Sequence, residues 1–82
     1  MPPSDTQRTF GLVIRQARER RQISQEALAA EAGLHRTYIS LLERGQRNPS
    51  LSVILQLAAA LKVSSPELLT AFESERRGAS LK

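Results

Sequence analysis

The strongest constraint on the fold lies mid-chain, where one glycine separates two short helical segments. Ser24 is a favourable N-cap for the first segment, from Gln25 to Ala32. Gly33 then stands where a helix end favours the left-handed backbone conformation. The second segment runs from about His35 to Arg44 and ends at Gly45. Neither segment is long enough to be stable alone, so the two must pack against each other and against further helices.

The residues of this stretch suit two helices that cross near a right angle. Ala29 is small where the second helix would approach the first. Apolar positions that can fill the corner occur throughout the stretch: Leu28, Ala32, Leu34, Ile39 and Leu42. This arrangement resembles the helix-turn-helix of DNA-binding proteins, whose second helix enters the major groove. The alternative is an ordinary corner of two helices in another small helical protein.

Capping residues and apolar spacing predict three further helices. Ser4 and Gln7 have capping-box spacing, so a helix should start near Asp5 and end near residues 20–22. Ser50 caps a fourth helix, and Ser65 before Pro66 opens a fifth as N-cap and N1. Their apolar stripes are Phe10, Val13, Ile14 and Ala17; then Leu51, Ile54, Leu55, Ala58 and Leu61; then Leu68, Leu69 and Phe72. We therefore expect an all-α fold, a compact five-helix bundle with no strand.

Length and composition predict one domain of limited chemistry. The chain has 82 residues, no cysteine and one histidine, so we expect no disulfide, metal site or cofactor. No apolar run reaches the length of a membrane span and no signal-peptide pattern is present, which predicts a cytoplasmic protein. We expect a flexible arm over residues 1–7, the functional domain over 8–76 and a frayed tail over 77–82.

Basic charge is concentrated in the N-terminal half. Residues 8–47 hold eight arginines and four glutamates, whereas residues 48–82 hold four basic and three acidic residues. Ten of the twelve basic residues are arginine, which suits bidentate contact with phosphate or guanine. The excess favours a nucleic-acid partner, the alternative being a solvated helical surface.

Several motifs resemble the phage repressor and Cro-like (XRE-type) helix-turn-helix family over about residues 8–72. They are Ile14-Arg15-x-x-Arg18, Ser24-Gln25-Glu26-x-Leu28-Ala29, Ile39-Ser40-x-x-Glu43-Arg44-Gly45, Asn48-Pro49-Ser50-Leu51 and Leu57-Ala58-x-x-Leu61. The segments 36–40 and 43–50 are most similar to controller proteins of restriction–modification systems. The resemblance implies a lambda-repressor-like domain that acts as a sequence-specific transcriptional regulator on its own promoter region.

The outward face of the second mid-chain helix supplies the expected base-reading residues. With Leu34, Ile39 and Leu42 buried, His35, Arg36, Thr37 and Ser40 face outward, together with Leu41 and Arg44. Arg36 can bind guanine O6 and N7, with phosphate contact as the alternative. Thr37 can contact a base or a phosphate, and Ser40 is small enough to permit close approach of the DNA. Tyr38 is expected to pack its ring on the domain and to point its hydroxyl at a phosphate.

The remaining DNA contacts are expected at phosphates. Gln25 begins a helix whose free N–H groups favour anions, and the resemblance implies a phosphate contact there. Arg44 and Arg47 follow the reading helix, and Arg15 is a further candidate. The resemblance implies that Arg18 and Glu43 form a partly buried ion pair between the first and third helices. Gln22 stands where the family often has glycine, which costs roughly 1 kcal/mol if φ is positive there.

A single motif of this kind reads few base pairs, so we expect a homodimer on a two-fold operator of double-stranded DNA. The predicted interface is apolar and nearly neutral: Val53, Leu57, Ala60, Leu68, Leu69 and Phe72. The alternative is that these residues are buried inside one copy. RNA polymerase is a further candidate partner.

An enzyme and an antitoxin are the two alternatives to a regulator. An enzyme could use Ser40, His35 and Glu43, but they lie on one short helix without a glycine elbow, so we expect no catalysis. An antitoxin that binds DNA and a toxin protein is the alternative function. The stretch after Phe72 is short for wrapping a toxin, which favours the controller.

Overall fold

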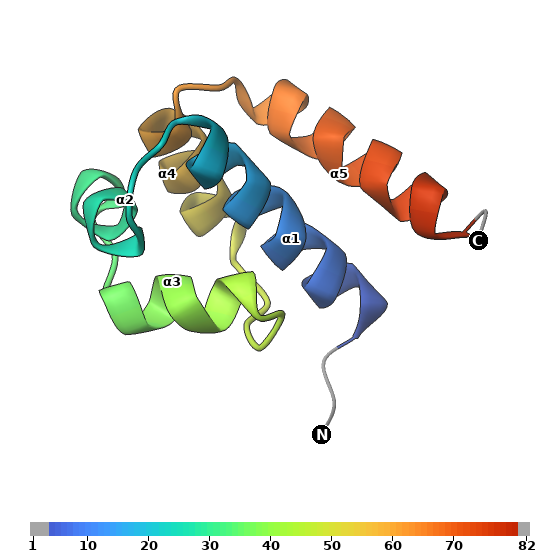
Figure 1. The fold of residues 1–82 in the computed structure, drawn as a ribbon, viewed down its shortest axis with the longest axis horizontal. Helices are drawn as coiled ribbons and strands as arrows, with labels where there is room; N and C mark the ends of the chain where they lie inside the picture. Colours follow the sequence, from blue (N-terminus) through green and yellow to red (C-terminus); the bar gives the residue numbers. More distant parts are fainter. Residues whose placement is uncertain (1–3, 81–82) are drawn as a thin grey trace.

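The computed structural model describes residues 4–80, and within that range it consists of five helices without a strand (Figure 1). They are α1 (Asp5–Arg20), α2 (Gln25–Ala32), α3 (Arg36–Glu43), α4 (Leu51–Leu61) and α5 (Ser65–Ser80). The expected all-α, five-helix architecture is confirmed. No single helix in residues 4–80 is long and apolar enough to span a membrane. Within the described part of the chain, the pair Leu51–Leu61 and Ser65–Gly78 alone reaches that length and composition, and it is bent by 100°.

Serine caps begin four of the helices. The Ser4 hydroxyl accepts from the backbone N–H of Gln7, and the Gln7 side chain accepts from the Ser4 backbone, which completes a capping box. Ser24 and Ser50 cap α2 and α4 as expected.

The fifth helix begins one residue earlier than predicted. Ser64, rather than Ser65, accepts from the backbone N–H of Glu67 at 3.1 Å, and Glu67 Oε1 accepts from the Ser64 backbone at 3.0 Å. The carboxylate of Glu67 favours Ser64 as the cap, because the two side chains together satisfy the two helix-end N–H groups of Ser64 and Glu67. Ser65 therefore occupies the first helical position, and Pro66 the second.

The ends of the domain are more helical than expected. Residues 5–7 of the predicted arm lie in α1, because the capping box at Ser4 starts the helix there. Residues 77–80 of the predicted tail continue α5, so Gly78 does not end it. A Glu73–Arg76 ion pair at 2.7 Å supports this last part of the helix. The rest of the predicted arm and tail, residues 1–3 and 81–82, lies outside the described residues.

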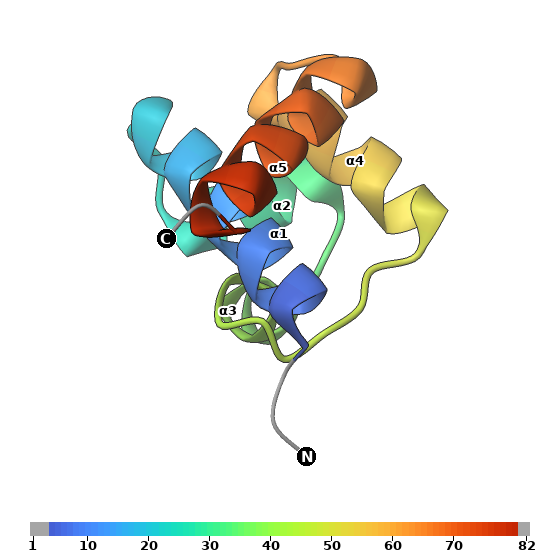
Figure 2. The same cartoon turned by 90° about the vertical axis from the view of Figure 1, so that its right-hand side faces the viewer.

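Helix α1 lies at the centre of the domain. It contacts α3 on one side and α5 on the other, while α2 packs against α3 and α4 (Figures 1 and 2). The buried core draws on all five helices and is apolar throughout: Phe10, Val13, Ile14, Leu28, Ala29, Ala32, Ile39, Leu42, Leu57, Ala58, Ala60, Leu61 and Leu68. Phe10 and Phe72 join α1 to α5 with ring centroids 6.2 Å apart.

Gly11 allows α1 and α3 to approach closely. A Cβ atom added at Gly11 would lie 2.8 Å from the backbone oxygen of Glu43 and would also clash with the backbone oxygen of Leu42. The spacing of apolar residues along α1 gave no sign of this requirement. The close approach brings the end of α3 next to α1, where Arg18 and Glu43 meet.

The buried face of α4 differs in part from the expected one, although Ala58 and Leu61 are buried as predicted. Leu51 and Leu55, predicted for the core stripe, are 71% and 50% exposed, whereas Leu57 and Ala60 are buried. Leu68 of α5 is buried as well. Because α4 is apolar on nearly every side, spacing alone did not select the face that meets α1, α2 and α5.

Among residues 4–80, two residues other than glycine occupy the left-handed region of backbone conformation, Gln22 with φ of 59° and Lys62 with φ of 60°. Both side chains are exposed, so glycine relieves backbone strain without losing packing. We expect Gln22→Gly and Lys62→Gly each to raise the free energy of unfolding by about 0.5–1 kcal/mol, measured by urea denaturation. Ala30→Gly in α2 is the control, with an expected loss of about 1 kcal/mol. A loss in all three variants would contradict the strain argument.

Candidate nucleic-acid interface

Helices α2 and α3 form the predicted helix-turn-helix. Gly33 ends α2 with φ of 70°, and the N–H of Leu34 donates to the Ala29 carbonyl at 2.9 Å to close the turn. Ile39 and Leu42 of α3 are fully buried against the rest of the domain. The opposite side of α3 lies at the edge of the molecule, free of other helices (Figure 1).

The outer surface of α3 carries the predicted reading residues. His35, Arg36 and Thr37 are exposed at its start, and Ser40 and Leu41 are partly buried further along. Arg36 Nε lies 3.4 Å from Oε1 of Glu26 on α2, and both side chains are largely exposed. An exposed pair of this length contributes little to stability, so the guanidinium is available to a ligand.

Arg44 caps the end of α3, Arg47 lies in the loop before α4, and the charge of Arg47 reaches Tyr38 of α3. Arg44 and Arg47 are exposed and donate to the backbone oxygens of Ser40 and Gln46, at 3.3 and 2.8 Å. Tyr38 is partly buried, and this burial raises the pKa of its phenol, while the positive charge of Arg47 opposes the shift. The phenol therefore stays protonated at neutral pH and can donate a hydrogen bond to a phosphate.

Arg15 belongs to a different helix from these residues. It lies on α1, is exposed, and pairs with Glu19 at 3.3 Å one turn along the same helix. An exposed i, i+4 pair of this kind is weak. The Arg15 guanidinium can therefore exchange Glu19 for another anion.

Arg18 and Glu43 form the ion pair that the resemblance implied. Arg18 Nε donates to Glu43 Oε2 at 2.7 Å, and a second guanidinium nitrogen donates to Oε1 at 3.0 Å. The third nitrogen donates to the Ile23 carbonyl at 2.9 Å. Only 13% of the Arg18 side chain and 4% of the Glu43 side chain are exposed. The hydrogen bonds to Glu43 raise the pKa of Arg18, so its guanidinium stays charged. The pair joins α1, α3 and the loop before α2.

Gln25 lies at the first position of α2, as predicted. Its side-chain Nε2 donates to Oε1 of Glu43 at 3.0 Å. The sequence gave no indication of this contact, because eighteen residues separate the two side chains and each had a different expected role. Arg21 likewise makes contacts that the sequence did not indicate: it donates to Glu31 at 2.8 Å and to the Ala60 carbonyl, which ties the end of α1 to α2 and α4.

The described residues give no support to a catalytic or metal centre. In the region 4–80, no three His, Asp or Glu side chains are grouped so that they could hold a metal ion. His35 is exposed, and Glu43 is already engaged by Arg18 and Gln25, so Ser40 has no oriented base.

The helix-turn-helix, with an exposed reading helix flanked by arginines, defines a protein of the DNA-binding class. A family model described as "Helix-turn-helix" matches residues 14–68. The chain belongs to this XRE-type helix-turn-helix family. The family's controller proteins are DNA-binding transcriptional regulators and not enzymes.

The similar proteins include controllers of restriction–modification systems. The chain is 51% identical to control protein C.SmaI of Serratia marcescens over 57 residues, which are 70% of this chain and 68% of that protein. The crystal structure of the restriction-modification controller C.AhdI from Aeromonas hydrophila is 48% identical, with a TM-score of 0.72, over 74% of this chain and 92% of that one. The controller C.Esp1396I, solved as a tetramer with its natural 35 base-pair operator, is 30% identical with a TM-score of 0.84, over 89% and 96% of the two chains.

Proposed function

We propose that this regulator is the controller of a restriction–modification system and binds, as a homodimer in the cytoplasm, a two-fold operator in its own promoter region. The observation that carries the proposal is the exposed face of α3, where Arg36 and Thr37 project from a helix whose other side is locked into the core. Similarity to controller proteins over most of the chain supports it.

The direct test is selection of bound sequences from random DNA, followed by binding to the region upstream of the chain's own reading frame. We expect a two-fold site that recurs in that region. A neighbouring endonuclease or methyltransferase gene agrees with the controller, and a small toxin gene supports the antitoxin instead. Selection without any enriched sequence contradicts sequence-specific regulation.

We propose that Arg36 contacts a base and that Arg47 contacts a phosphate. Arg36→Ala should weaken binding to the cognate site by about 1–3 kcal/mol and relax preference at one base pair of each half-site. Arg47→Ala should weaken cognate and random DNA by similar factors, because phosphates carry no sequence information directly. Anisotropy titrations on both duplexes measure this difference. If Arg36→Ala weakened binding to the cognate and the random duplex by equal factors, Arg36 would be a phosphate ligand instead.

The proposed dimer surface differs from the predicted set. Leu57, Ala60 and Leu68 are buried in the core of one copy, so they are not available to a second copy. The large exposed apolar side chains that the structure describes on α4 and α5 are instead Leu51, Leu55 and Leu69, and Val53 and Phe72 are only partly buried. Helix α4 carries no charged residue, so two positively charged copies can meet there without repulsion.

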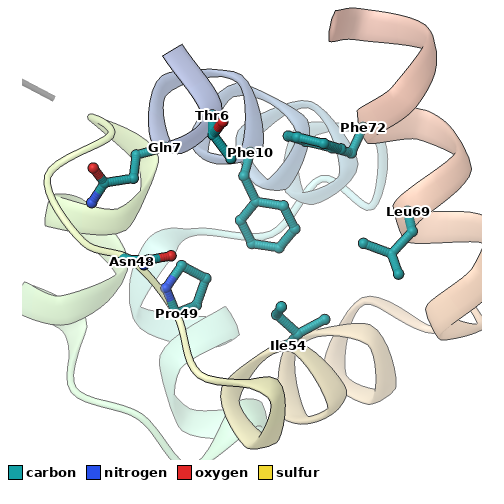
Figure 3. Close-up of a pocket in the computed structure, with 8 residues that line it drawn as sticks. All are labelled: Thr6, Gln7, Phe10, Asn48, Pro49, Ile54, Leu69 and Phe72. Carbon is teal, nitrogen blue, oxygen red and sulfur yellow. The ribbon is translucent and has the colours of Figure 1, made fainter. Parts of the chain in front are cut away.

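A small, largely apolar cavity is lined by Leu69. It has a volume of about 170 Å³, and Figure 3 shows Phe10, Ile54, Leu69 and Phe72 around it, with Asn48 and Pro49 of the loop on one side. Leu51 precedes Ile54 by one turn of α4. An aliphatic side chain of the second copy would fill this cavity and bury the exposed leucines.

We expect Leu55→Lys to convert the dimer to a monomer at micromolar concentration, because a charge would be buried at the contact. Leu12→Lys, at an exposed leucine of α1, should leave the association unchanged. Sedimentation equilibrium measures both, and operators with half-sites spaced other than about 10–10.5 base pairs apart should bind more weakly. A wild-type monomer that binds one half-site as tightly as the full site contradicts the dimer.

RNA polymerase is a second proposed partner, since a controller that activates transcription binds close to it on the promoter. Co-retention of polymerase with the bound operator fragment, compared with a fragment lacking the operator, tests this contact.

A further inference from the structure

The carboxylate of Glu43 accepts hydrogen bonds from side chains of two other helices. Its bidentate pairing with Arg18 already joins α3 to α1, and the third nitrogen of that guanidinium is satisfied by the Ile23 carbonyl. Oε1 nevertheless accepts a further hydrogen bond from Gln25 Nε2 of α2 at 3.0 Å. The joining of α1 and α3 does not need Gln25.

Gln25 occupies the end of α2 that favours anions. As the first residue after the Ser24 cap, it has a backbone N–H without a partner inside the helix. Its side-chain amide nitrogen carries two hydrogens about 120° apart, of which Glu43 accepts one. The second hydrogen is left for a ligand. Because Arg18 balances the charge of Glu43, the carboxylate can lie near DNA without repelling it.

We infer that Glu43 is a positioning residue, which holds the Gln25 amide in the orientation that binds a DNA phosphate. The inference rests on the proposed function, because it needs DNA as the ligand. A long side chain that is ordered before binding loses less entropy on binding, which is equivalent to about 3- to 10-fold in affinity at each half-site. A symmetric dimer uses two copies of Gln25, so the expected effect is about 10- to 100-fold per operator.

The test compares four proteins in anisotropy titrations with a cognate and a random duplex. They are the wild type, Gln25→Met, the pair Arg18→Met with Glu43→Leu, and all three substitutions together. An apolar pair of similar size can replace a buried ion pair without loss of the fold, which thermal melting checks. Gln56→Met on α4 is the matched control, with affinity expected within twofold of the wild type.

We expect Gln25→Met to weaken both duplexes about 10- to 100-fold in the wild-type background. In the background without the ion pair, the same change should cost no more than about threefold, because Gln25 has already lost its orientation. An equal cost in both backgrounds would overturn the inference while leaving the proposed function intact. A wild type that binds no duplex would remove the proposed function and this inference together.

NMR of the free wild-type protein gives a second test that needs no variant. The Gln25 side-chain amide should show an order parameter close to that of the rigid backbone, about 0.85, since Glu43 holds one of its hydrogens. An order parameter below about 0.6, typical of a mobile side chain, would overturn the inference. Should melting show that the ion-pair variant is unfolded, this measurement decides the question.

Discussion

Arg18→Ala is expected to lower the free energy of unfolding by about 3–5 kcal/mol, because it leaves the carboxylate of Glu43 buried without its charge partner. The side chain of Glu43 is only 4% exposed, so water cannot replace the two lost hydrogen bonds. For a domain of this size the loss is a large share of the total stability. Urea denaturation with a constant m-value measures it.

The exposed pair Arg15–Glu19 provides the matched control. Glu19→Ala removes an ion pair of similar chemistry from the surface of α1, where both side chains are more than half exposed. We expect a loss of no more than about 0.5 kcal/mol. A similar small loss for Arg18→Ala would mean that the buried pair contributes no more than a surface pair.

Operator affinity should fall steeply with salt. We expect the arginines of residues 8–47 to make about five to eight phosphate contacts per dimer, each of which should contribute about −0.9 to the slope of log K against log[salt]. A slope of about −5 to −7 corresponds to a thousandfold to ten-thousandfold loss between about 50 and 200 mM salt. Anisotropy titrations over this range measure the slope.

Arg47→Ala should make the slope shallower by about 2, because each dimer loses two phosphate contacts. An uncharged surface variant such as Ser52→Ala, on the exposed side of α4, should leave it unchanged. Affinity that does not depend on salt would contradict binding through the arginine-rich surface.

Most helix boundaries were predictable because they depend on neighbours within one turn. Ser4, Ser24 and Ser50 cap helices wherever they stand before a helical segment, and Gly33 can take a positive φ at little cost. The start of α5 was misplaced by one residue because Ser64 and Ser65 compete, and the choice depended on Glu67. Its extension to Ser80 was missed because glycine disfavours a helix without always ending one.

The reading surface was also predictable, since burial of Ile39 and Leu42 leaves the other side of a regular helix outside. The contacts among the charged and polar residues of this surface were not predictable. The Arg36–Glu26 pair and the Gln25–Glu43 bond depend on the angle between α2 and α3. Local spacing contains no information about that angle.

By itself the sequence determined the five helices, the helix-turn-helix and the family, because caps, glycines and apolar spacing act over a few residues. Only the tertiary structure decided which face of α4 is buried, since an apolar helix can present any side until its neighbours cover one. The same packing required Gly11, where α1 meets α3, and assigned Leu57, Ala60 and Leu68 to the core. Long-range contacts select among faces that local interactions leave equal in energy.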